Sequence, residues 1–489
     1  MRLTASDLYT YFRPSKCDLR VYLRHAGEPE TPPGPYQEVL FRLAERHEKA
    51  HLATFPEVRD LSSVPLTERL GQTAEALKQR APVIYQGALS SVVELNGVRC
   101  ELLGEPDFLI RGDEGYVIRD SKISKRIDEQ NHPEIIYQLR LYGWLYEQTF
   151  GARPERLEVH SGPGDIVPIE YDGGNAALDA LRRILNLKRA ASEFYSPVGW
   201  TKCGDCGFRD RCWQRAERDR DVALVSDIDQ NLARVLHQQN IVSLNDLVGL
   251  PESQLAAIER PWGKGTRRVG AQAKRILQSA RALASGKELI LSSPDVPKSA
   301  SYAIFDLEGL PPHLDELEKV YLWGIQVFGE QSGPYRCATA GFGPDGDRQA
   351  WEEFIQIADE IFAQYGDLPI VHWSHYERTK LDLYMSRFGD RDGIAARVRQ
   401  NLVDLLPITQ KALVLPLPSY SLKVVEKYIG FQRKMAETNG EWAMAKYIEA
   451  VETEDAHSRD AVMEQIREYN REDLEASWAV LKWLMSKRS

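Results

Sequence analysis

Residues 104–142 read GEPDFLIRGDEGYVIRDSKISKRIDEQNHPEIIYQLRLY, and they carry the clearest structural pattern in the chain. Two strand-like runs, 101–110 and 116–122, are joined by the short turn RGDEG, so we expect them to pair as a β-hairpin. Such a hairpin can place Asp107 and Asp120 side by side. Because two close carboxylates repel each other, the pattern predicts a divalent cation such as Mg²⁺, which prefers carboxylate oxygens and water.

Lys122 follows Asp120 by two residues, so both side chains lie on one face of the strand. A lysine beside a metal-bound water can orient or deprotonate that water, and it can screen the charge of the transition state. The pattern Pro-Asp…Asp-x-Lys across a hairpin resembles the PD-(D/E)xK nuclease family. The resemblance implies a catalytic site in which Asp107 and Asp120 bind Mg²⁺ or Mn²⁺ and Lys122 assists the water.

The helix expected over 133–150 places Gln138 and Tyr142 on one face, four residues apart. This Gln-xxx-Tyr motif is similar to the RecB-type branch of the family, which implies that both residues orient the lysine or the substrate. In an upstream helix expected over 36–52, His47 matches the histidine that supplies a further metal ligand in that branch. The branch's glycine three residues earlier is Ala44 here, and a packing or surface histidine stays the alternative for His47.

The segment TKCGDCGFRDRC contains three cysteines within ten residues: Cys203, Cys206 and Cys212. In a reducing compartment such spacing indicates a metal site, and Cys17 is the natural fourth ligand. One distant cysteine plus C-x2-C-x5-C resembles iron–sulfur nucleases, among them the AddB-type subunit and the CRISPR-associated RecB-like exonucleases. The resemblance implies a structural [4Fe–4S] cluster, with zinc as the alternative. We interpret Cys100 and Cys337 as ordinary buried thiols.

A second acidic motif lies far downstream. Asp306 and Glu308 are two apart in the strand-like run YAIFDLEG, and Tyr469 precedes Asp473 by one helical turn. Asp-x-Glu followed by Tyr-xxx-Asp resembles the DEDD exonucleases of the RNase H-like fold. The resemblance implies two metal ions about 3.5–4 Å apart, with Tyr469 positioning the attacking water.

The third acid of that pattern is less regular. Glu377, in LPIVHWSHYERTKL, occupies the place where the family has an aspartate, and its side chain is longer by one methylene. With Glu377 as a ligand, the two ions would be bound by four acids. Asp404, in NLVDLLPI, is an alternate or supporting carboxylate.

The middle of the chain is basic. From Arg260 to Lys287 there are eight Lys/Arg and no Asp/Glu. Residues 226–285 resemble helix-hairpin-helix modules, which implies a hairpin at 261–265 that offers backbone N–H groups to phosphate. Three cations would add charge to this nucleic-acid contact: Lys264, Arg267 and Arg268. The hairpin's first glycine is Pro261 here, and a plain helical linker with a solvated basic face is the alternative.

Composition sets broad limits. A length of 489 residues predicts roughly two to four domains. Apolar content of 43% and charged content of 27% indicate a globular chain, and no long apolar run or secretory signal is present, so we expect a cytoplasmic protein without a membrane span. The formal net charge of −10 argues against a basic coat for nucleic acid but not against a metal-dependent nuclease.

Together these features predict an α/β multidomain chain. Residues 1–222 would form a restriction-endonuclease-like PD-(D/E)xK domain, 223–292 a small helix-hairpin-helix-like module, and 293–489 an RNase H-like domain. The combination resembles RecB-like nucleases with a C-terminal RNase H-like domain. It implies a metal-dependent nuclease, most simply an exonuclease on DNA ends or single strands.

Two other functions stay open at this point. A non-catalytic nucleic-acid-binding scaffold with degenerate nuclease folds is one, and an RNase acting only through the C-terminal domain is the other. No Walker A sequence is present, so any unwinding of a duplex would need a separate helicase.

Overall fold

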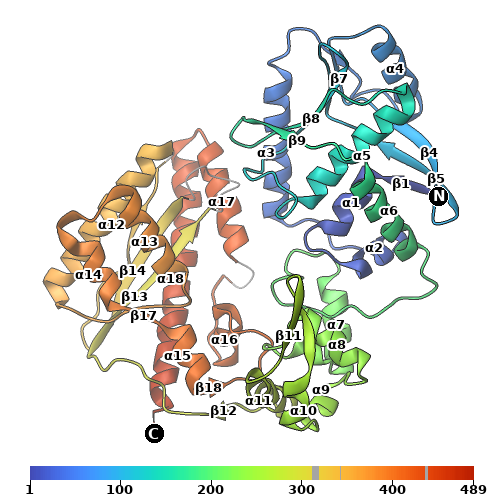
Figure 1. The fold of residues 1–489 in the computed structure, drawn as a ribbon. Helices are drawn as coiled ribbons and strands as arrows, with labels where there is room; N and C mark the ends of the chain where they lie inside the picture. The colour runs from blue at the N-terminus through green and yellow to red at the C-terminus, as the bar shows by residue number, and fades with distance from the viewer. Residues whose placement is uncertain (311–318, 342, 436–438, 489) are drawn as a thin grey trace. The chain divides into compact units, whose positions relative to one another are not determined.

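A computed structural model describes residues 1–310, 319–341, 343–435 and 439–488 (Figure 1). The chain divides into two compact units. The N-terminal unit comprises Met1–Ser196 and Thr201–Cys212, and the C-terminal unit comprises Pro197–Trp200 and Trp213–Ser489. The division of the C-terminal unit into a helical module and an RNase H-like domain stays a prediction. No helix among the described residues is long and apolar enough to span a bilayer.

The N-terminal unit contains two sheets. A six-stranded sheet has the order β2-β3-β6-β7-β8-β9, and a three-stranded sheet has the order β1-β5-β4. The strands are β1 (Arg2–Thr4), β2 (Arg59–Asp60), β3 (Val83–Tyr85), β4 (Leu89–Leu95), β5 (Val98–Gly104), β6 (Phe108–Arg111), β7 (Tyr116–Ser121), β8 (Arg156–His160) and β9 (Ile166–Ile169). The helices are α1 (Ala5–Phe12), α2 (Asp18–His25), α3 (Pro35–Leu52), α4 (Leu66–Lys78), α5 (Pro133–Phe150) and α6 (Asn175–Lys188), and α7 (Arg209–Asp219) crosses the boundary between the units.

The long strand expected over 101–110 is two strands. β5 ends at Gly104 and pairs in the smaller sheet, whereas β6 begins at Phe108 and pairs with β7 in the larger one. Pro106 lies in the break, because it lacks the N–H that a continuous ladder would need. The expected hairpin is formed by β6 and β7, and its register places Phe108 opposite Arg119.

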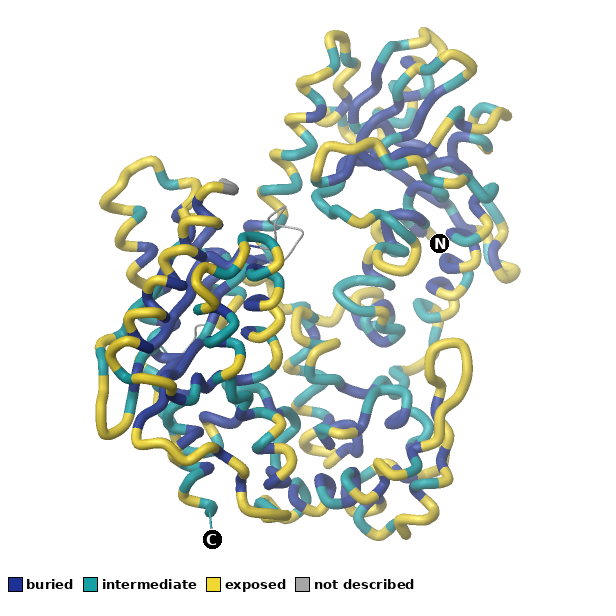
Figure 2. Tube along the Cα trace, turned by 60° about the vertical axis from the view of Figure 1, so that its left-hand side comes forward, coloured by how far each residue is buried: buried dark blue, intermediate teal, exposed yellow. Residues whose placement is uncertain are grey.

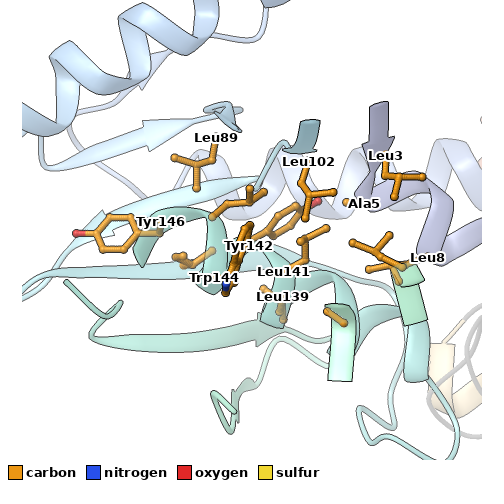
Figure 3. Close-up of a cluster of buried hydrophobic side chains, with 14 of the residues drawn as sticks. Leu3, Ala5, Leu8, Leu89, Leu102, Leu139, Leu141, Tyr142, Trp144 and Tyr146 are labelled. Atoms are coloured by element: carbon orange, nitrogen blue, oxygen red, sulfur yellow. The ribbon is translucent and has the colours of Figure 1, made fainter. Parts of the chain in front are cut away.

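Helix α5 is the centre of this unit. Ten of its 18 residues are buried, so it is apolar on more than one face and packs between neighbours rather than on a surface. It connects β7 to β8, which run parallel, and it contacts β4, β5 and α1. Figure 3 shows Leu139 and Tyr142 of α5 in one buried cluster with Leu102 of β5 and Leu8 of α1.

The C-terminal unit begins with short helices: η1 (Val222–Leu224), α8 (Gln230–Gln238), α9 (Leu244–Val248), α10 (Glu252–Ala257) and α11 (Gln272–Ser285). Between α10 and α11, residues expected to form a helical hairpin turn instead make an antiparallel β-hairpin of β10 (Glu259–Trp262) and β11 (Gly265–Arg268). Both strands are largely exposed, as Figure 2 shows. Strand β12 (Leu289–Ile290) then pairs with β18 (Leu413–Val414).

A five-stranded mixed sheet forms the rest of this unit, in the order β15-β14-β13-β16-β17. Its strands are β13 (Ser301–Gly309), β14 (Val320–Gly329), β15 (Arg336–Thr339), β16 (Ile370–His372) and β17 (Leu402–Asp404). The accompanying helices are α12 (Gly343–Tyr365), α13 (Tyr376–Phe388), η2 (Arg391–Gly393), α14 (Ile394–Asn401), α15 (Leu405–Ala412), α16 (Leu422–Tyr428), α17 (Gly440–Glu452) and α18 (Ala456–Ser486).

Helix α18 packs on β13 and β14 and brings the end of the chain to the centre of this sheet. Ile304 of β13 and Val371 of β16 share a buried cluster with Leu474 and Leu481 of α18. Because these apolar contacts fix the rotation of α18, they also determine which of its polar residues face β13. The two distant acidic motifs of the sequence therefore meet on one surface of the sheet.

Candidate active sites

The first site lies at the start of β6 and the end of β7, where Asp107 and Asp120 are interlocked by backbone hydrogen bonds. The Asp107 N–H donates to Asp120 Oδ1 over 3.0 Å, and the Ser121 N–H donates to Asp107 Oδ2 over 2.9 Å. Asp107 is 9% exposed and Asp120 is 1% exposed. Each carboxylate is therefore held next to the other by the strand that carries its neighbour.

Lys122 completes this group. Its Nζ lies 3.0 Å from Asp120 Oδ2 and 3.8 Å from Asp107 Oδ2. Burial raises the pKa of Asp107 to about 8, the Asp120 charge adds to the rise, and Lys122 opposes it. Burial lowers the pKa of Lys122, but Asp120 and Asp107 outweigh that effect and raise it overall. One ammonium thus incompletely offsets two buried carboxyl groups, and further positive charge would be stabilising here.

Gln138 and Tyr142 meet on α5 as their spacing predicts. Gln138 Nε2 donates to the Tyr142 hydroxyl oxygen over 2.7 Å, and Tyr142 is 2% exposed. Burial raises the pKa of Tyr142, and the charges of Asp120 and Asp107 raise it further, so the hydroxyl lies within their electrostatic influence. The ring packs against Gly104, where an added Cβ would lie 2.5 Å from Tyr142 Cδ1. A glycine at this position allows the helix to approach the sheet closely.

His47 lies in a stack of imidazole rings. It packs parallel to His160 with ring centroids 4.3 Å apart, and His51 packs on His160 at 3.9 Å. His160 Nδ1 is 2.9 Å from Ser121 Oγ, beside the site. Among the described residues, the structure does not bring ligand atoms of His47, Asp107 and Asp120 within 4.8 Å of one another. The metal-ligand role of His47 stays a prediction.

Glu48, the residue after His47, is linked to the site and was missed by sequence reasoning. Gln86 Nε2 donates to Glu48 Oε1 over 2.7 Å and to Asp107 Oδ1 over 3.1 Å. The Tyr85 hydroxyl donates to the same Glu48 oxygen over 2.8 Å. The Glu48 charge also raises the pKa of Asp107, after burial and Asp120. Its position beside the matched histidine was the one available signal.

Three of the four cysteines line one apolar cluster built on Leu19, Leu23 and Phe208, namely Cys17, Cys206 and Cys212. Burial raises the pKa of the Cys206 thiol, and Cys17 and Cys203 add to the rise, so these sulfur atoms are near neighbours. The structure gives all six cysteines as thiols rather than as disulfides. Among the described residues, no three of these sulfurs lie within 4.8 Å of one another.

The second site is formed by Asp306, Glu308 and Asp473. Each residue offers one carboxylate oxygen, and these three oxygens lie within 4.8 Å of one another. Among the described residues this is the only group of three or more possible metal ligands. Alternation along β13 points Asp306 and Glu308 to one face, and α18 brings Asp473 to it. Burial raises the pKa of Asp306 and of Glu308 well above the ordinary range, and the neighbouring carboxylates raise them further. The donor set therefore fits a hard divalent cation.

Tyr469 and Asn470 flank this group from α18. Burial raises the pKa of Tyr469, and Asp473 and Glu308 add to the rise. Asn470 Nδ2 donates to Asp306 Oδ2 over 2.7 Å. A Cβ at Gly324 of β14 would lie 1.8 Å from Asn470 Oδ1, so glycine leaves room for this amide. Sequence reasoning missed Asn470, whose only signal was its place next to Tyr469.

Glu377 lies near the three acids, since its charge raises the pKa of Asp306 and of Glu308, but neither Glu377 nor Asp404 belongs to the described group within 4.8 Å. Glu377 Oε2 is 3.1 Å from His372 Nδ1 at the end of β16. Asp404 Oδ1 accepts the N–H groups of Ser374 and Leu406, over 2.9 and 3.0 Å, and so caps α15. Both acids already have partners, and the structure assigns neither to the metal-holding cluster of the described residues.

Two cations contact Asp473, and neither was indicated by the sequence. Lys423 Nζ of α16 lies 3.3 Å from Asp473 Oδ1. Arg433 Nη2 also donates to Asp473 Oδ1, and the same guanidinium binds Glu426 through Nε at 2.6 Å and Nη2 at 2.7 Å. Arg433 is 7% exposed at its side chain. Their positions follow from the packing of α16 on α18.

The three basic residues of the middle segment lie on the β10–β11 hairpin and are exposed: Lys264, Arg267 and Arg268. Trp262, at the end of β10, is 51% exposed, and the Arg267 guanidinium carbon is 5.0 Å from the centroid of its ring. Arg260 is opposite Arg267 in the hairpin register, but it is buried with its Nε 3.2 Å from Asp229 Oδ2, whereas Arg267 is exposed. Arg268 is offset by Glu259, with Nε 3.0 Å from Oε1.

Comparison with known proteins finds two family models that match separate parts of the chain. The family model of the PD-(D/E)XK nuclease superfamily matches residues 28–213, and that of the RNase H superfamily matches residues 303–485. No curated protein matches. Six solved chains match, among them one titled "Crystal structure of SSO0001". Its sequence identity is 17%, and the match covers 43% of this chain and 85% of that one. Its TM-score of 0.23 is too low for this similarity to support a statement about fold or function.

Each matched segment contains one of the two acid groups described above: Asp107 and Asp120 in the first, and Asp306, Glu308 and Asp473 in the second. The chain is therefore a mixed α/β protein that carries a PD-(D/E)XK nuclease-superfamily domain followed by an RNase H-superfamily domain.

Proposed function

We propose that this chain is a metal-dependent nuclease that hydrolyses phosphodiester bonds, acting as an exonuclease on DNA ends or single strands. The observation that carries the proposal is the convergence of Asp306, Glu308 and Asp473 from distant parts of the sequence, with Glu308 and Asp473 buried and Asp306 half-buried. Buried carboxylates are costly unless they are paired or coordinate a metal, and the two cations that contact Asp473 leave Glu308 to be offset by a bound divalent cation. Mg²⁺ or Mn²⁺, when bound, would supply a Lewis acid and an activated water.

In the first site, Asp107 and Asp120 would hold the ion, with His47 as a further ligand. Lys122 lies beside both carboxylates, where its ammonium would orient water and screen phosphate charge. Gln138 fixes the Tyr142 hydroxyl, and the pair positions the lysine or the substrate.

In the second site, Tyr469 would align the attacking water, since its ring lies on the helical turn before Asp473. Glu377 contributes through His372 rather than as a direct ligand in the arrangement described. Asn470 holds Asp306 Oδ2 and thereby leaves the other oxygen of that carboxylate for the cation.

The four cysteines, Cys17, Cys203, Cys206 and Cys212, would bind a structural [4Fe–4S] cluster. Zinc is the alternative, because sites built from four thiolates suit it too. The remote first ligand Cys17 and the five residues between Cys206 and Cys212 favour the iron–sulfur cluster, as in the nucleases that this cysteine pattern resembles.

The nucleic acid would be gripped by the β10–β11 hairpin, with Lys264, Arg267 and Arg268 at phosphates and Trp262 as a stacking platform for a base. This local basic surface would bind a strand despite the acidic net charge. A separate helicase would supply single strands from a duplex, because the chain has no Walker A sequence.

Cleavage of labelled single-stranded DNA and RNA with Mn²⁺ tests the proposal. Wild-type chain should cut, and Lys122→Ala and Asp306→Ala should each lower the rate by about 10²-fold or more at the site they affect. Loss in only one variant assigns the activity to that domain, and cleavage of RNA alone by the Asp306-dependent site supports the RNase alternative. Tight binding without any cutting would leave the scaffold as the function.

A further inference from the structure

The surroundings of Asp473 suggest how many ions the second site takes. Asp473 is 5% exposed, and both of its cationic partners contact the same oxygen, Oδ1. Lys423 approaches from α16, and Arg433 approaches from the segment that follows this helix. Oδ2 is therefore the oxygen of Asp473 left for a cation shared with Asp306 and Glu308.

Lys423 lies beside the whole acid group. Its Nζ is 3.3 Å from Asp473 Oδ1, and a ligand oxygen of Asp473 lies within 4.8 Å of those of Asp306 and Glu308. Its Nζ also lies 4.5 Å from the centroid of the Tyr469 ring. The ammonium thus lies between the acid group and the ring of Tyr469.

Arg433 is fixed in place by its other contacts. Its guanidinium binds both oxygens of Glu426, which is 2% exposed. The backbone N–H groups of Lys434 and Met435 donate to the two oxygens of Glu472 over 2.7 and 3.3 Å. The segment that carries Arg433 is therefore tied to α18 at the residue preceding Asp473.

The two other candidate ligands for a second ion already have partners. Glu377 pairs with His372, and Asp404 caps α15. Neither belongs to the cluster of three acids among the described residues. The described group provides three acids for binding ions, one fewer than a four-acid site. A second divalent ion would also be repelled by the two fixed positive charges of Lys423 and Arg433.

We infer that the second site binds one divalent ion, and that Lys423 and Arg433 take the place of the second ion as fixed cations that screen the phosphate. The inference rests on the proposed nuclease function and replaces the two-ion arrangement that the resemblance implies. It gives Arg433 the role of holding Asp473 and Lys423 the role of charge screening near the reacting phosphate.

Direct Mn²⁺ binding tests this inference without relying on cleavage. The full chain carrying Asp107→Asn and Asp120→Asn would be titrated with Mn²⁺, with free Mn²⁺ followed by electron paramagnetic resonance. We expect one ion per chain, and we expect Asp306→Asn to remove it. Two ions per chain, or one ion that survives Asp306→Asn, would overturn the inference.

Lys423→Gln gives a second measurement. Because it removes a like charge near the cation, it should tighten Mn²⁺ binding by about tenfold, whereas Lys423→Arg keeps the charge and should retain the wild-type affinity. Lys427→Gln is the matched control, an exposed lysine on the same helix. Equal affinity in Lys423→Gln and Lys427→Gln would contradict the inference. A chain that binds one Mn²⁺ in this manner but cuts nothing refutes the nuclease proposal alone.

Discussion

Asp107 illustrates how much a single residue's surroundings change its chemistry. Its carboxyl group lies beside Asp120 in a buried position, and the pKa is raised to about 8, first by burial and then by Asp120. The folded chain without metal therefore holds a proton here that the unfolded chain releases near pH 4. The stability that this group contributes is full below that pH and is lost as the pH rises towards 8.

Asp107→Asn should remove this dependence. Relative to the wild type without metal, the Tm of the variant should rise progressively between about pH 5 and pH 8, because the amide never ionises. Scanning calorimetry at several pH values measures it. Adding Mg²⁺ at pH 8 should raise the Tm of the wild type more than that of the variant, because the variant keeps only the ion site at Asp306, Glu308 and Asp473.

Asp113→Asn is the control, an exposed aspartate in the turn between the same two strands. Its Tm difference from the wild type should be constant over this pH range. A constant difference for Asp107→Asn as well would show that Asp107 is not protonated in the metal-free fold.

Sequence identified the acids of both sites but not the residues that support them. Asp107, Asp120, Asp306 and Asp473 each belong to a short motif with fixed spacing. Glu48, Asn470, Lys423 and Arg433 act through contacts made by helices that are far away in the sequence. Nothing in the local spacing of these four residues marks them, because their neighbours exist only once the helices have packed.

At the scale of elements, the β10–β11 hairpin shows how a motif can be placed correctly and shaped differently. The basic residues fall between two helices as expected, but strands replace the helical turn. A two-stranded hairpin with an exposed tryptophan contributes little to a core. Its exposed Trp262 and flanking arginines are instead suited to an unpaired strand of nucleic acid.

Trp262→Ala should weaken binding of single-stranded DNA by about tenfold or more, since stacking on one aromatic ring is worth roughly 1–3 kcal/mol. Lys264→Gln should weaken it less and should lower the slope of log affinity against log salt by about one phosphate contact. Fluorescence anisotropy of a labelled oligonucleotide at several salt concentrations measures both effects.

Arg391→Gln serves as the control, because Arg391 is a 78% exposed arginine outside the hairpin. We expect its affinity and salt slope to match the wild type. If Trp262→Ala binds as tightly as Arg391→Gln, the hairpin is not the strand-binding surface.

At the scale of the whole molecule, the cysteines tie together distant parts of the N-terminal unit. Cys17 and Cys206 belong to one apolar cluster, although most of that unit's sequence separates them. A group bound to both would close a very long loop and reduce the entropy of the unfolded chain. Its contribution should therefore appear as stability of this unit rather than as a step of catalysis.

Cys17→Ser should cost the N-terminal unit its bound metal and much of its stability. A loss of about 3 kcal/mol would lower the Tm by roughly 6–12 °C for a unit of this size. Anaerobically purified wild type should show a broad absorbance band at roughly 400 nm together with bound iron, and Cys17→Ser should lose both.

Cys337→Ser is the control. Because Cys337 lies in the C-terminal unit, this variant should keep the iron and the absorbance band. Bound zinc with no such band would support the zinc alternative. Equal metal content in Cys17→Ser and the wild type would exclude Cys17 as a ligand.

The sequence by itself determined the local patterns: the β6–β7 hairpin, the helix over 133–150, and the strand that carries Asp306 and Glu308. These follow from turn residues, helical periodicity and strand alternation, which act over a few residues. Only the tertiary structure decided that Asp473 meets Asp306, that Glu377 pairs with His372, and that two cations lie on Asp473. Those contacts depend on how buried apolar faces rotate each helix against the sheet, and local spacing contains no information about that rotation.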